Sequence, residues 1–374
     1  MTITRAPLTI FHVSTEKKWQ GGEQQALHLA EGLRQKGHRS VIVARRDGAF
    51  AERLQAANFE VHTFGHRGRG PDSLWALRRL VSSIAPDVIH SHDGHAITAS
   101  GLATLGLRPP LRVASRRVAF PIRSSRKFRL LTDVVVGISR AVMDVCRQHG
   151  IPDSMLRLVP SGVDPNRVAA GDRCRGRRSL CLQEDEPLLT VVASLTPCKG
   201  HTFLLDALPE ILAHYPKLRV AFVGDGEIAA SLKAQVTQLG LESCTMFLGY
   251  RDDVPDMIQA ADLFVMPSLT EGLGTSLLDA MFARVPIVTT GAGGIADVIG
   301  LDDPQGPCAR IAVARDSHSL ASAILEGLSR KDEGALLVER AFQRAHEKFT
   351  HNEMVTGTLA VYDEWLGKNR QRAA

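Results

Sequence analysis

The stretch Met266-Pro-Ser-Leu-Thr-Glu-Gly-Leu-Gly-Thr-Ser-Leu-Leu-Asp-Ala-Met281 decides the fold of this chain. It follows the apolar run Asp262-Leu-Phe-Val-Met266, which predicts a short buried strand. Gly272 and Gly274 allow a tight turn of the backbone, and the apolar residues that follow predict a helix through Met281. A buried strand that passes through a glycine turn into a helix is typical of a parallel α/β sheet.

The start of this helix is a candidate phosphate site. Thr275 and Ser276 are placed to cap the helix, and the free N–H groups and positive dipole end of a helix attract a phosphate. Glu271 and Asp279 flank the start, and like charge prevents either from binding the phosphate itself. We expect them to accept hydrogen bonds from sugar hydroxyls, which together predicts a nucleotide-sugar pocket. The alternative is a plain strand-to-helix turn, which many α/β proteins contain.

The spacing of the two acids resembles a known signature. Glu271, seven residues and Asp279 are similar to the E-x7-E motif of the GT-B glycosyltransferases in retaining glycosyltransferase family 4, except that Asp replaces the usual second Glu. The resemblance implies that Glu271 holds the hydroxyls of the donor sugar and that Asp279 holds the ribose, with a side chain one methylene shorter. It also implies that the turn and helix start bind the donor through Gly272, Gly274, Thr275 and Ser276.

The composition indicates an ordinary globular protein of two domains. The chain has 374 residues, of which 44% are hydrophobic and 23% are charged. It contains no apolar stretch of signal-peptide or membrane-spanning length. The six cysteines form no C-x-x-C pair, so we expect a reduced, cytoplasmic protein.

The charge is unevenly divided. Residues 1–170 carry 25 Lys and Arg against 13 Asp and Glu, whereas residues 171–374 carry 20 against 27. The basic first half predicts an acidic partner, which is either the anionic inner face of the cytoplasmic membrane or a phosphate-bearing acceptor. A merely soluble basic surface is the alternative. Nucleic acid is disfavoured because aromatic residues make up 5% of the chain and no nucleic-acid motif is present.

Strands and helices alternate along almost the whole chain, which predicts a doubly wound α/β architecture. The resemblance implies a GT-B fold of two Rossmann-like domains facing a central cleft. We expect an acceptor-side domain over residues 1–168, a nucleotide-sugar domain over 169–350, and a C-terminal helix over 351–374 that crosses back to the first domain. The polar stretch 171–178 is expected to be a surface connection, and 66–71 a basic loop.

A second cluster follows the first strand of the nucleotide-sugar domain. Lys199, beside a glycine, can bring a positive charge to a diphosphate. The family usually places an Arg five residues earlier, where this chain has Ser194, and we expect Ser194 to offer a neutral hydrogen bond instead. His201 is interpreted as a surface residue at the start of a helix.

Three further segments of the first half can be compared with the family pattern, of which two match it and the third, Arg116-Arg117, departs from it. Gly21-Gly22 corresponds to the glycine pair whose amides face the donor phosphates in relatives, and His92 belongs to an H-x-H segment. Arg116 and Arg117 stand where several relatives place a His near the reacting sugar. Arginine cannot act as a general base, so the pair is interpreted as binding a phosphorylated acceptor or supporting the departing diphosphate. A capping or core role is the alternative for His92.

The resemblance places Arg251 near the base or a phosphate of the nucleotide. No D-x-D pair in metal-ligand surroundings occurs, so we predict that the chain uses no metal and no cofactor, with a nucleoside diphosphate sugar as co-substrate. Lys199, the helix start and Gly21-Gly22 would then stabilise the leaving diphosphate.

The predicted activity is retaining, metal-independent transfer of a hexose to a glycan or lipid-linked acceptor, for example in surface polysaccharide or lipopolysaccharide synthesis. Glu271 and Lys199 are the predicted catalytic residues. Two alternatives remain open: a nucleotide-sugar 2-epimerase of the same fold, and a non-catalytic subunit that binds the nucleotide sugar.

Overall fold

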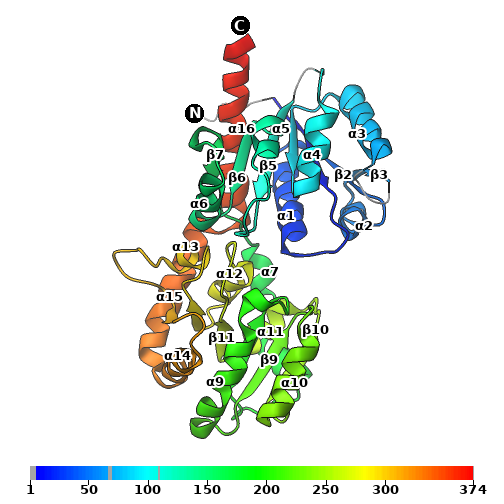
Figure 1. The fold of residues 1–374 in the computed structure, drawn as a ribbon. Coiled ribbons are helices and arrows are strands. Elements are labelled where there is room, and N and C mark those ends of the chain that lie inside the picture. Colours follow the sequence, from blue (N-terminus) through cyan, green and yellow to red (C-terminus); the bar gives the residue numbers. More distant parts are fainter. Residues whose placement is uncertain (1–5, 66–69, 108–109, 374) are drawn as a thin grey trace. The chain divides into compact units, whose positions relative to one another are not determined.

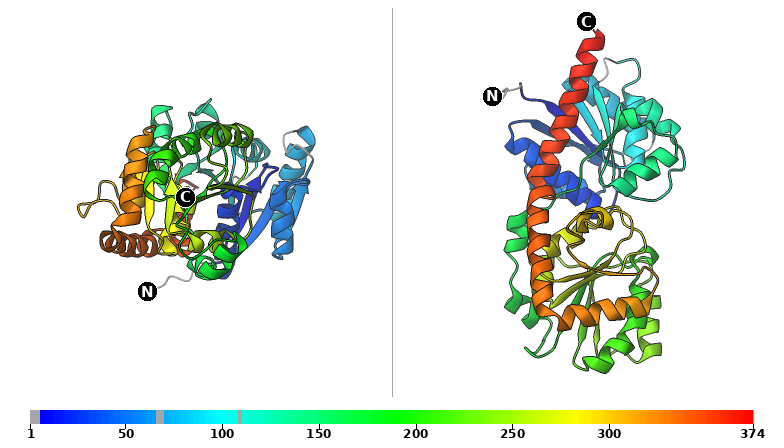
Figure 2. Two further views of the ribbon diagram at one scale, coloured as in Figure 1. Left: turned by 90° about the horizontal axis from the view of Figure 1, so that it is seen from below. Right: turned by 90° about the vertical axis from the view of Figure 1, so that its left-hand side faces the viewer.

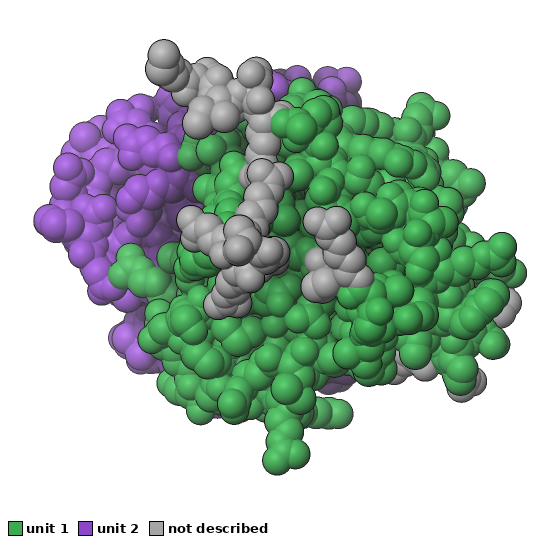
Figure 3. Space-filling model, turned by 90° about the horizontal axis from the view of Figure 1, so that it is seen from above, with its two compact units in different colours: residues 1–162, 351–374 green, residues 163–350 purple. Residues whose placement is uncertain are grey.

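The computed structural model describes residues 6–65, 70–107 and 110–373. The chain divides into two compact units, coloured in Figure 3: unit 1 comprises Met1–Gly162 and His351–Ala374, and unit 2 comprises Val163–Thr350. Most of the basic loop expected over 66–71 lies outside the described residues.

Unit 1 is built on a parallel sheet with the strand order β3-β2-β1-β4-β5-β6-β7 (Figure 1). Its strands are β1 Thr9–Ser14, β2 Arg39–Arg45, β3 Glu60–Phe64, β4 Val88–Ser91, β5 Leu111–Arg116, β6 Val134–Gly137 and β7 Leu156–Leu158. Its helices are α1 Gly21–Gln35, α2 Ala49–Ala56, α3 Pro71–Ile84, α4 Gly94–Ala103, α5 Arg126–Leu131, α6 Arg140–Gln148 and α16 His351–Ala373.

The two faces of this sheet are covered by different helices. Ile10 and Val88 pack on one face with residues of α1 and α16, among them Tyr362. Phe11 and Val13 pack on the other face with residues of α3 and α4. This alternation follows from the period of two along each strand. The last helix of the chain therefore belongs to the core of unit 1, and its length is clear in Figure 2.

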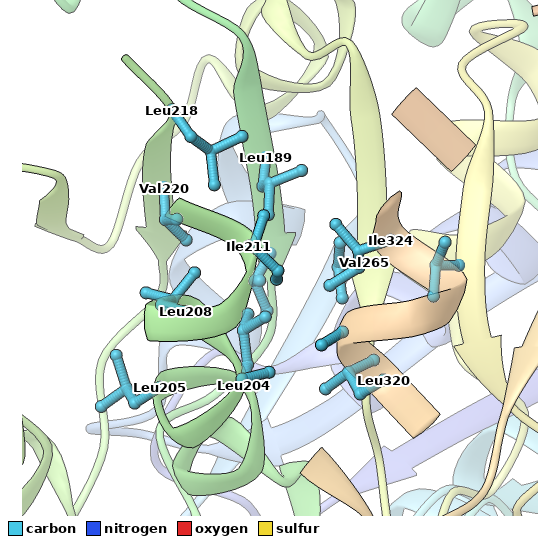
Figure 4. Packing of buried hydrophobic residues seen from close by; sticks show 14 of the residues in the cluster. Leu189, Leu204, Leu205, Leu208, Ile211, Leu218, Val220, Val265, Leu320 and Ile324 are labelled. Carbon is cyan, nitrogen blue, oxygen red and sulfur yellow. The ribbon is translucent and has the colours of Figure 1, made fainter. Parts of the chain in front are cut away.

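Unit 2 contains a parallel sheet with the order β10-β9-β8-β11-β12-β13. Its strands are β8 Leu188–Val192, β9 Arg219–Val223, β10 Thr245–Gly249, β11 Leu263–Met266, β12 Ile287–Thr290 and β13 Arg310–Ala312. Its α-helices are α7 Pro165–Ala169, α8 Arg173–Ser179, α9 His201–His214, α10 Ala229–Leu239, α11 Val254–Ala260, α12 Thr275–Phe282, α13 Ile295–Ile299, α14 Ser317–Ser329 and α15 Lys331–Lys348. Figure 4 shows leucine and isoleucine side chains of α9 and α14 packed on the aliphatic residues of β8, β9 and β11.

The predicted α/β class with two doubly wound sheets is confirmed. In each sheet the order of strands reverses direction at one point, between β1 and β4 in unit 1 and between β8 and β11 in unit 2. Ligands of such sheets bind outside the carboxyl ends of the strands at this switch point. The loops that follow these four strands are therefore the places to look for a site.

Three details differ from the sequence prediction. Strands β7 and β13 were not expected, because each has only three residues and offers no measurable period. The stretch 171–178 is not a plain surface connection: it forms α8, whose Asp172 cap accepts a hydrogen bond from the Arg175 N–H. Arg177 of α8 is buried and donates to the Glu186 carbonyl oxygen at 2.8 Å. The arginines that suggested a solvated segment instead fix this helix to unit 2.

Within the described ranges, no helix combines the length and apolar character that a membrane crossing requires.

Candidate active site

Two loops at the switch point of unit 2 are joined by their backbones. The carbonyl oxygen of Cys198, in the short 3-10 helix Pro197–Lys199 after β8, accepts the N–H of Leu269 at 2.8 Å. Gly200 then has a φ of +69°, and a Cβ at this position would collide with the Pro267 carbonyl oxygen. Only glycine suits such a left-handed, close approach. The segment containing Lys199 is therefore fixed against the loop that leads to Glu271.

Lys199 and Glu271 form an ion pair at this junction. Their side chains are 17% and 12% exposed, so both charges are largely removed from water and compensate each other. The Glu271 backbone is held as well, because its carbonyl oxygen accepts the Gly294 N–H at 2.9 Å. A Cβ on Gly293 would collide with that same oxygen. The glycine turn after β12 thus supports the loop of Glu271.

Helix α12 begins directly after this loop. Gly274 is its N-cap residue, with a φ of +88°, and no side chain caps the helix. The expectation that Thr275 and Ser276 cap it is wrong, because the left-handed glycine moves both into the first turn, and the Ser276 hydroxyl donates to the Val192 carbonyl oxygen at 2.7 Å. Since no side chain takes the first N–H groups, the start of α12, together with Gly272, can accept an anion.

The second acid, Asp279, lies one turn inside α12. Its side chain is 10% exposed, and its Oδ1 lies 2.5 Å from Nη2 of Arg167 on α7. Burial raises the pKa of Asp279, and the Arg167 guanidinium opposes this rise. The Arg167 Nε–H is buried without a partner among the described residues. Asp279 is therefore held by a cation that the sequence analysis did not single out.

The other predicted donor residues have different surroundings. Ser194 is exposed, and its carbonyl oxygen lies 3.2 Å from Nε2 of His201. His201 is buried rather than on the surface, and burial lowers its pKa to about 4. Arg251 pairs with Asp253, with its Nε at 2.7 Å from Oδ1. The guanidinium of Arg251 is thus already engaged within its own turn.

The switch point of unit 1 contains three stacked histidines. His12 of β1 and His90 of β4 are register partners, and His92 follows two residues after His90. The His12 and His92 rings lie 5.3 Å apart and the His90 and His92 rings 4.6 Å apart. All three are buried, and burial lowers the pKa of His12 to about 3 and the pKa values of His90 and His92 well below the usual range. We call these three residues the histidine ladder.

Hydrogen bonds connect the ladder to its surroundings. Nδ1 of His12 lies 3.0 Å from Nε2 of His92. Nδ1 of His90 lies 2.6 Å from the Tyr362 hydroxyl of α16, and Nε2 of His90 lies 2.7 Å from the Ser115 hydroxyl. The ladder therefore lies on the same face of the sheet as Ile10 and Val88, the face that α1 and α16 cover. Along this face the strands carry aliphatic residues first and polar residues near their carboxyl ends.

Arg117 adjoins this ladder. Its Nη2 donates to Nδ1 of His92 at 3.1 Å. A Cβ on Gly22, in the first turn of α1 after Gly21, would lie 3.9 Å from the Arg117 Cδ. The Arg116 side chain instead donates a hydrogen bond to the Phe120 carbonyl oxygen. Of the predicted acceptor-side residues, the structure thus brings together His92 and Arg117, and it places Gly22, which was predicted to bind the donor, beside them.

A buried carboxyl group stands near Arg117. Glu23 of α1 accepts the Gln20 N–H at 3.2 Å, and burial raises its pKa to about 7. Sequence reasoning missed Glu23, His12, His90 and Tyr362. His12 and His90 could have been found from the sequence, because each is a polar residue on the core-facing side of a strand that is otherwise apolar.

Among the described residues, no group of three or more His, Cys, Asp or Glu side chains is arranged to hold a metal ion.

The architecture is that of the GT-B proteins. A crystal structure of HepE from Anabaena, in complex with UDP and glucose, superposes with a TM-score of 0.83 at 21% identity and covers 96% of this chain and all of that one. Two family models also match: Glycosyltransferase Family 4 over residues 19–167 and Glycosyl transferases group 1 over residues 172–344. The chain belongs to the GT-B glycosyltransferases that these two family models describe.

Two curated relatives are similar over part of their length. An uncharacterised glycosyltransferase of Methanocaldococcus jannaschii is 28% identical over 242 residues, which are 61% of this chain and 59% of that protein. A GDP-mannose-dependent α-(1-6)-phosphatidylinositol monomannoside mannosyltransferase of Mycolicibacterium smegmatis is 28% identical over 264 residues, or 64% of this chain and 69% of that protein.

Proposed function

We propose that the chain transfers a hexose from a nucleoside diphosphate sugar to a glycan or lipid-linked acceptor, with retention at the anomeric carbon. The observation that carries this proposal is the Lys199–Glu271 ion pair beside the uncapped start of α12. It places a cation and free helix N–H groups for a diphosphate next to a carboxylate for sugar hydroxyls. The names of the relatives support the same substrate types, since HepE was crystallised with UDP and glucose and the Mycolicibacterium enzyme uses a lipid acceptor.

In the proposed reaction, the bond from the anomeric carbon to the diphosphate oxygen breaks. The acceptor oxygen bonds to the same face of that carbon, and its proton passes to the leaving diphosphate. Lys199 and the start of α12 would stabilise the charge that develops on the diphosphate, a contribution of about 3–4 kcal/mol for one well-placed donor. No metal or cofactor is required by this scheme. Asp279, held by Arg167, would accept a hydrogen bond from the ribose.

The basic character of unit 1 supports a lipid-linked acceptor at an anionic membrane face. Between Asp93 and Asp133 the sequence has eight Lys and Arg residues and no acid. In the same segment Phe120 is 52% exposed and Leu130 is 70% exposed. Exposed apolar side chains among arginines are typical of a peripheral membrane contact. Vesicles that contain anionic lipid should bind the protein, and this binding should weaken as the salt concentration rises. Vesicles of uncharged lipid should not bind it.

The test of the activity is a screen with UDP, GDP, ADP and their sugars. The nucleoside diphosphate with one of these three bases should bind, and at twenty times its dissociation constant it should raise the free energy of unfolding by about 1.8 kcal/mol. Incubation of the matching sugar nucleotide with glycan and lipid acceptors should then release the nucleoside diphosphate with the anomeric configuration retained. Isomerisation of the donor without acceptor would indicate a 2-epimerase instead. Binding without any release would indicate a non-catalytic subunit.

A further inference from the structure

We propose that Arg117 is the anion-binding residue of unit 1 and that the acceptor carries an acidic group, phosphate or carboxylate. The assignment of this group to an acceptor rests on the proposed function. The anion site itself rests on the surroundings of Arg117.

The Arg117 guanidinium has few partners. It donates to Nδ1 of His92 at 3.1 Å and to the His92 carbonyl oxygen at 3.5 Å. Within the described part of the chain it forms no ion pair, and burial lowers its pKa to about 10 against the opposing charge of Glu23. A cation that is partly removed from water is unfavourable unless an anion or several acceptors compensate it. The remaining N–H groups of Arg117 are suited to the two oxygens of a phosphate or carboxylate.

The histidine ladder orients this guanidinium. Because Arg117 can only donate, Nδ1 of His92 must accept, and the ring proton of His92 must be on Nε2. That proton is donated to Nδ1 of His12, so His12 carries its own proton on Nε2, which is buried without a partner among the described residues. Both ring nitrogens of His92 are thereby used. His92 is a positioning residue for Arg117, and its ring has no nitrogen left for a substrate.

The neighbouring acids Glu23 and Asp93 raise the pKa of Arg117, but among the described residues neither forms an ion pair with it. Asp93 is saturated, since its carboxylate accepts the N–H and hydroxyl of Thr15 and the N–H groups of His95 and Ala96. Glu23 accepts the Gln20 N–H in the capping box of α1, and its burial favours the neutral form. The capping box occupies the N–H of Glu23 in the first turn of α1, a helix of 15 residues, so this turn contributes the N–H groups of Gly21 and Gly22, of which Gly22 lies beside Arg117. The remaining N–H groups of Arg117 are therefore not taken by either acid and stay available to an anion.

The same anion chemistry could come from the donor diphosphate, so the test must separate the two sources. Binding of inorganic phosphate, glucose 6-phosphate, glucuronate and glucose is measured on a Lys199→Ala chain, in which the cation of unit 2 is removed. The two acidic sugars should bind at least tenfold more tightly than glucose. Adding Arg117→Gln should abolish this preference, and Arg117→Lys should retain part of it.

Nucleotide binding is measured in parallel on chains with Lys199 intact. Arg117→Gln should leave the affinity for the nucleoside diphosphate within about twofold. If Arg117→Gln instead weakens the nucleotide as much as Lys199→Ala does, Arg117 belongs to the donor diphosphate and the proposal is wrong. An unchanged preference for the acidic sugars in Arg117→Gln also contradicts it. Failure of the proposed function would appear separately, as the absence of nucleotide binding in the unaltered chain.

The ladder has its own test. His12→Asn places an amide oxygen near the position of Nδ1 and keeps the acceptor for His92, whereas His12→Leu removes it. His12→Leu should weaken binding of glucose 6-phosphate several-fold without a change in nucleotide affinity, and His12→Asn should restore most of it. Equal loss in both variants would mean that the ladder only supports the fold.

Discussion

The two switch points have the same backbone topology but opposite electrostatic arrangements. In unit 2 each acid has a cation beside it, Lys199 with Glu271 and Arg167 with Asp279. In unit 1 three buried histidines stack, of which His12 and His92 share a hydrogen bond, and Arg117 is left without an ion pair among the described residues. The order of strands fixes where a ligand binds, and the residues that end the strands decide what kind of ligand it is.

The difference has a chemical meaning. An entering diphosphate can take Lys199 from Glu271, and this exchange leaves the carboxylate free for a sugar hydroxyl. Unit 1 has no such pair to exchange, so an anion there meets a guanidinium that is already oriented. The comparison predicts that changes in unit 2 affect the activated sugar and that changes in unit 1 affect the acceptor.

Removal of the Lys199 ammonium should have the largest effect. Lys199→Ala takes away the cation for the leaving diphosphate, so kcat should fall by about 10²–10³-fold. The nucleotide-dependent rise in melting temperature should disappear as well. Lys217→Ala is the matched control, because Lys217 pairs with Asp185 on the surface of the same unit. Full activity in the Lys199 variant would remove this residue from the mechanism.

Loss of the Arg167 guanidinium should come next. Arg167→Met leaves the buried Asp279 carboxylate without its cation, which should lower the free energy of unfolding by about 3 kcal/mol at pH 7. The loss should shrink towards pH 4, because the pKa of Asp279 is already raised by burial and a protonated carboxyl no longer needs a cation. Denaturant unfolding at both pH values measures this difference.

Arg178→Met is the control for that experiment, since Arg178 is an exposed arginine of α8. An equal loss of stability at pH 7 and pH 4 for Arg167→Met would show that packing, rather than charge, is the contribution of this side chain.

Acid should destabilise the protein through the histidine ladder. The pKa of His12 is about 3 in the folded state, below the usual 6.5, so this neutral histidine contributes stability above pH 6.5 that is lost as the pH falls towards 3. For His12 alone the loss amounts to about 2 kcal/mol at pH 5. His12→Leu should therefore remove about this much of the decline in unfolding free energy between pH 7 and pH 5. An unchanged pH dependence would show that His12 is charged in the folded protein.

The smallest effect is expected at the start of α12. Ser276→Ala removes the hydrogen bond from the Ser276 hydroxyl to the Val192 carbonyl oxygen, which should cost about 1 kcal/mol of stability. Ser231→Ala, which removes a hydrogen bond on the exposed surface of α10, should cost less. If the two substitutions cost the same in thermal unfolding, the bond of Ser276 does not hold α12 to β8.

Sequence reasoning reached the fold because its signals are periodic and local. The apolar run before Pro267 and the glycine turn at Gly274 are visible in one stretch, and the structure forms β11 and α12 there. Strands of three residues, such as β13, are too short to show a period. The capping of α12 was predicted wrongly because a left-handed glycine moves the helix start by one residue.

The partners of the site residues could not be read from the sequence. Arg167 and Asp279 are separated by 112 residues, and Tyr362 and His90 by 272. No local pattern records that such residues meet, because the meeting depends on how helices return to the sheets. The motif spacing and the family resemblance assigned Glu271 and Lys199 to one donor site, and in the structure the two residues form an ion pair.

The most direct test of the central claim is a crystal structure of the protein soaked with its nucleoside diphosphate sugar. We predict that the diphosphate lies against the start of α12 with Lys199 on its oxygens, and that Glu271 has exchanged Lys199 for a hydroxyl of the sugar. A ligand bound elsewhere, with the Lys199–Glu271 pair still closed, would contradict the account.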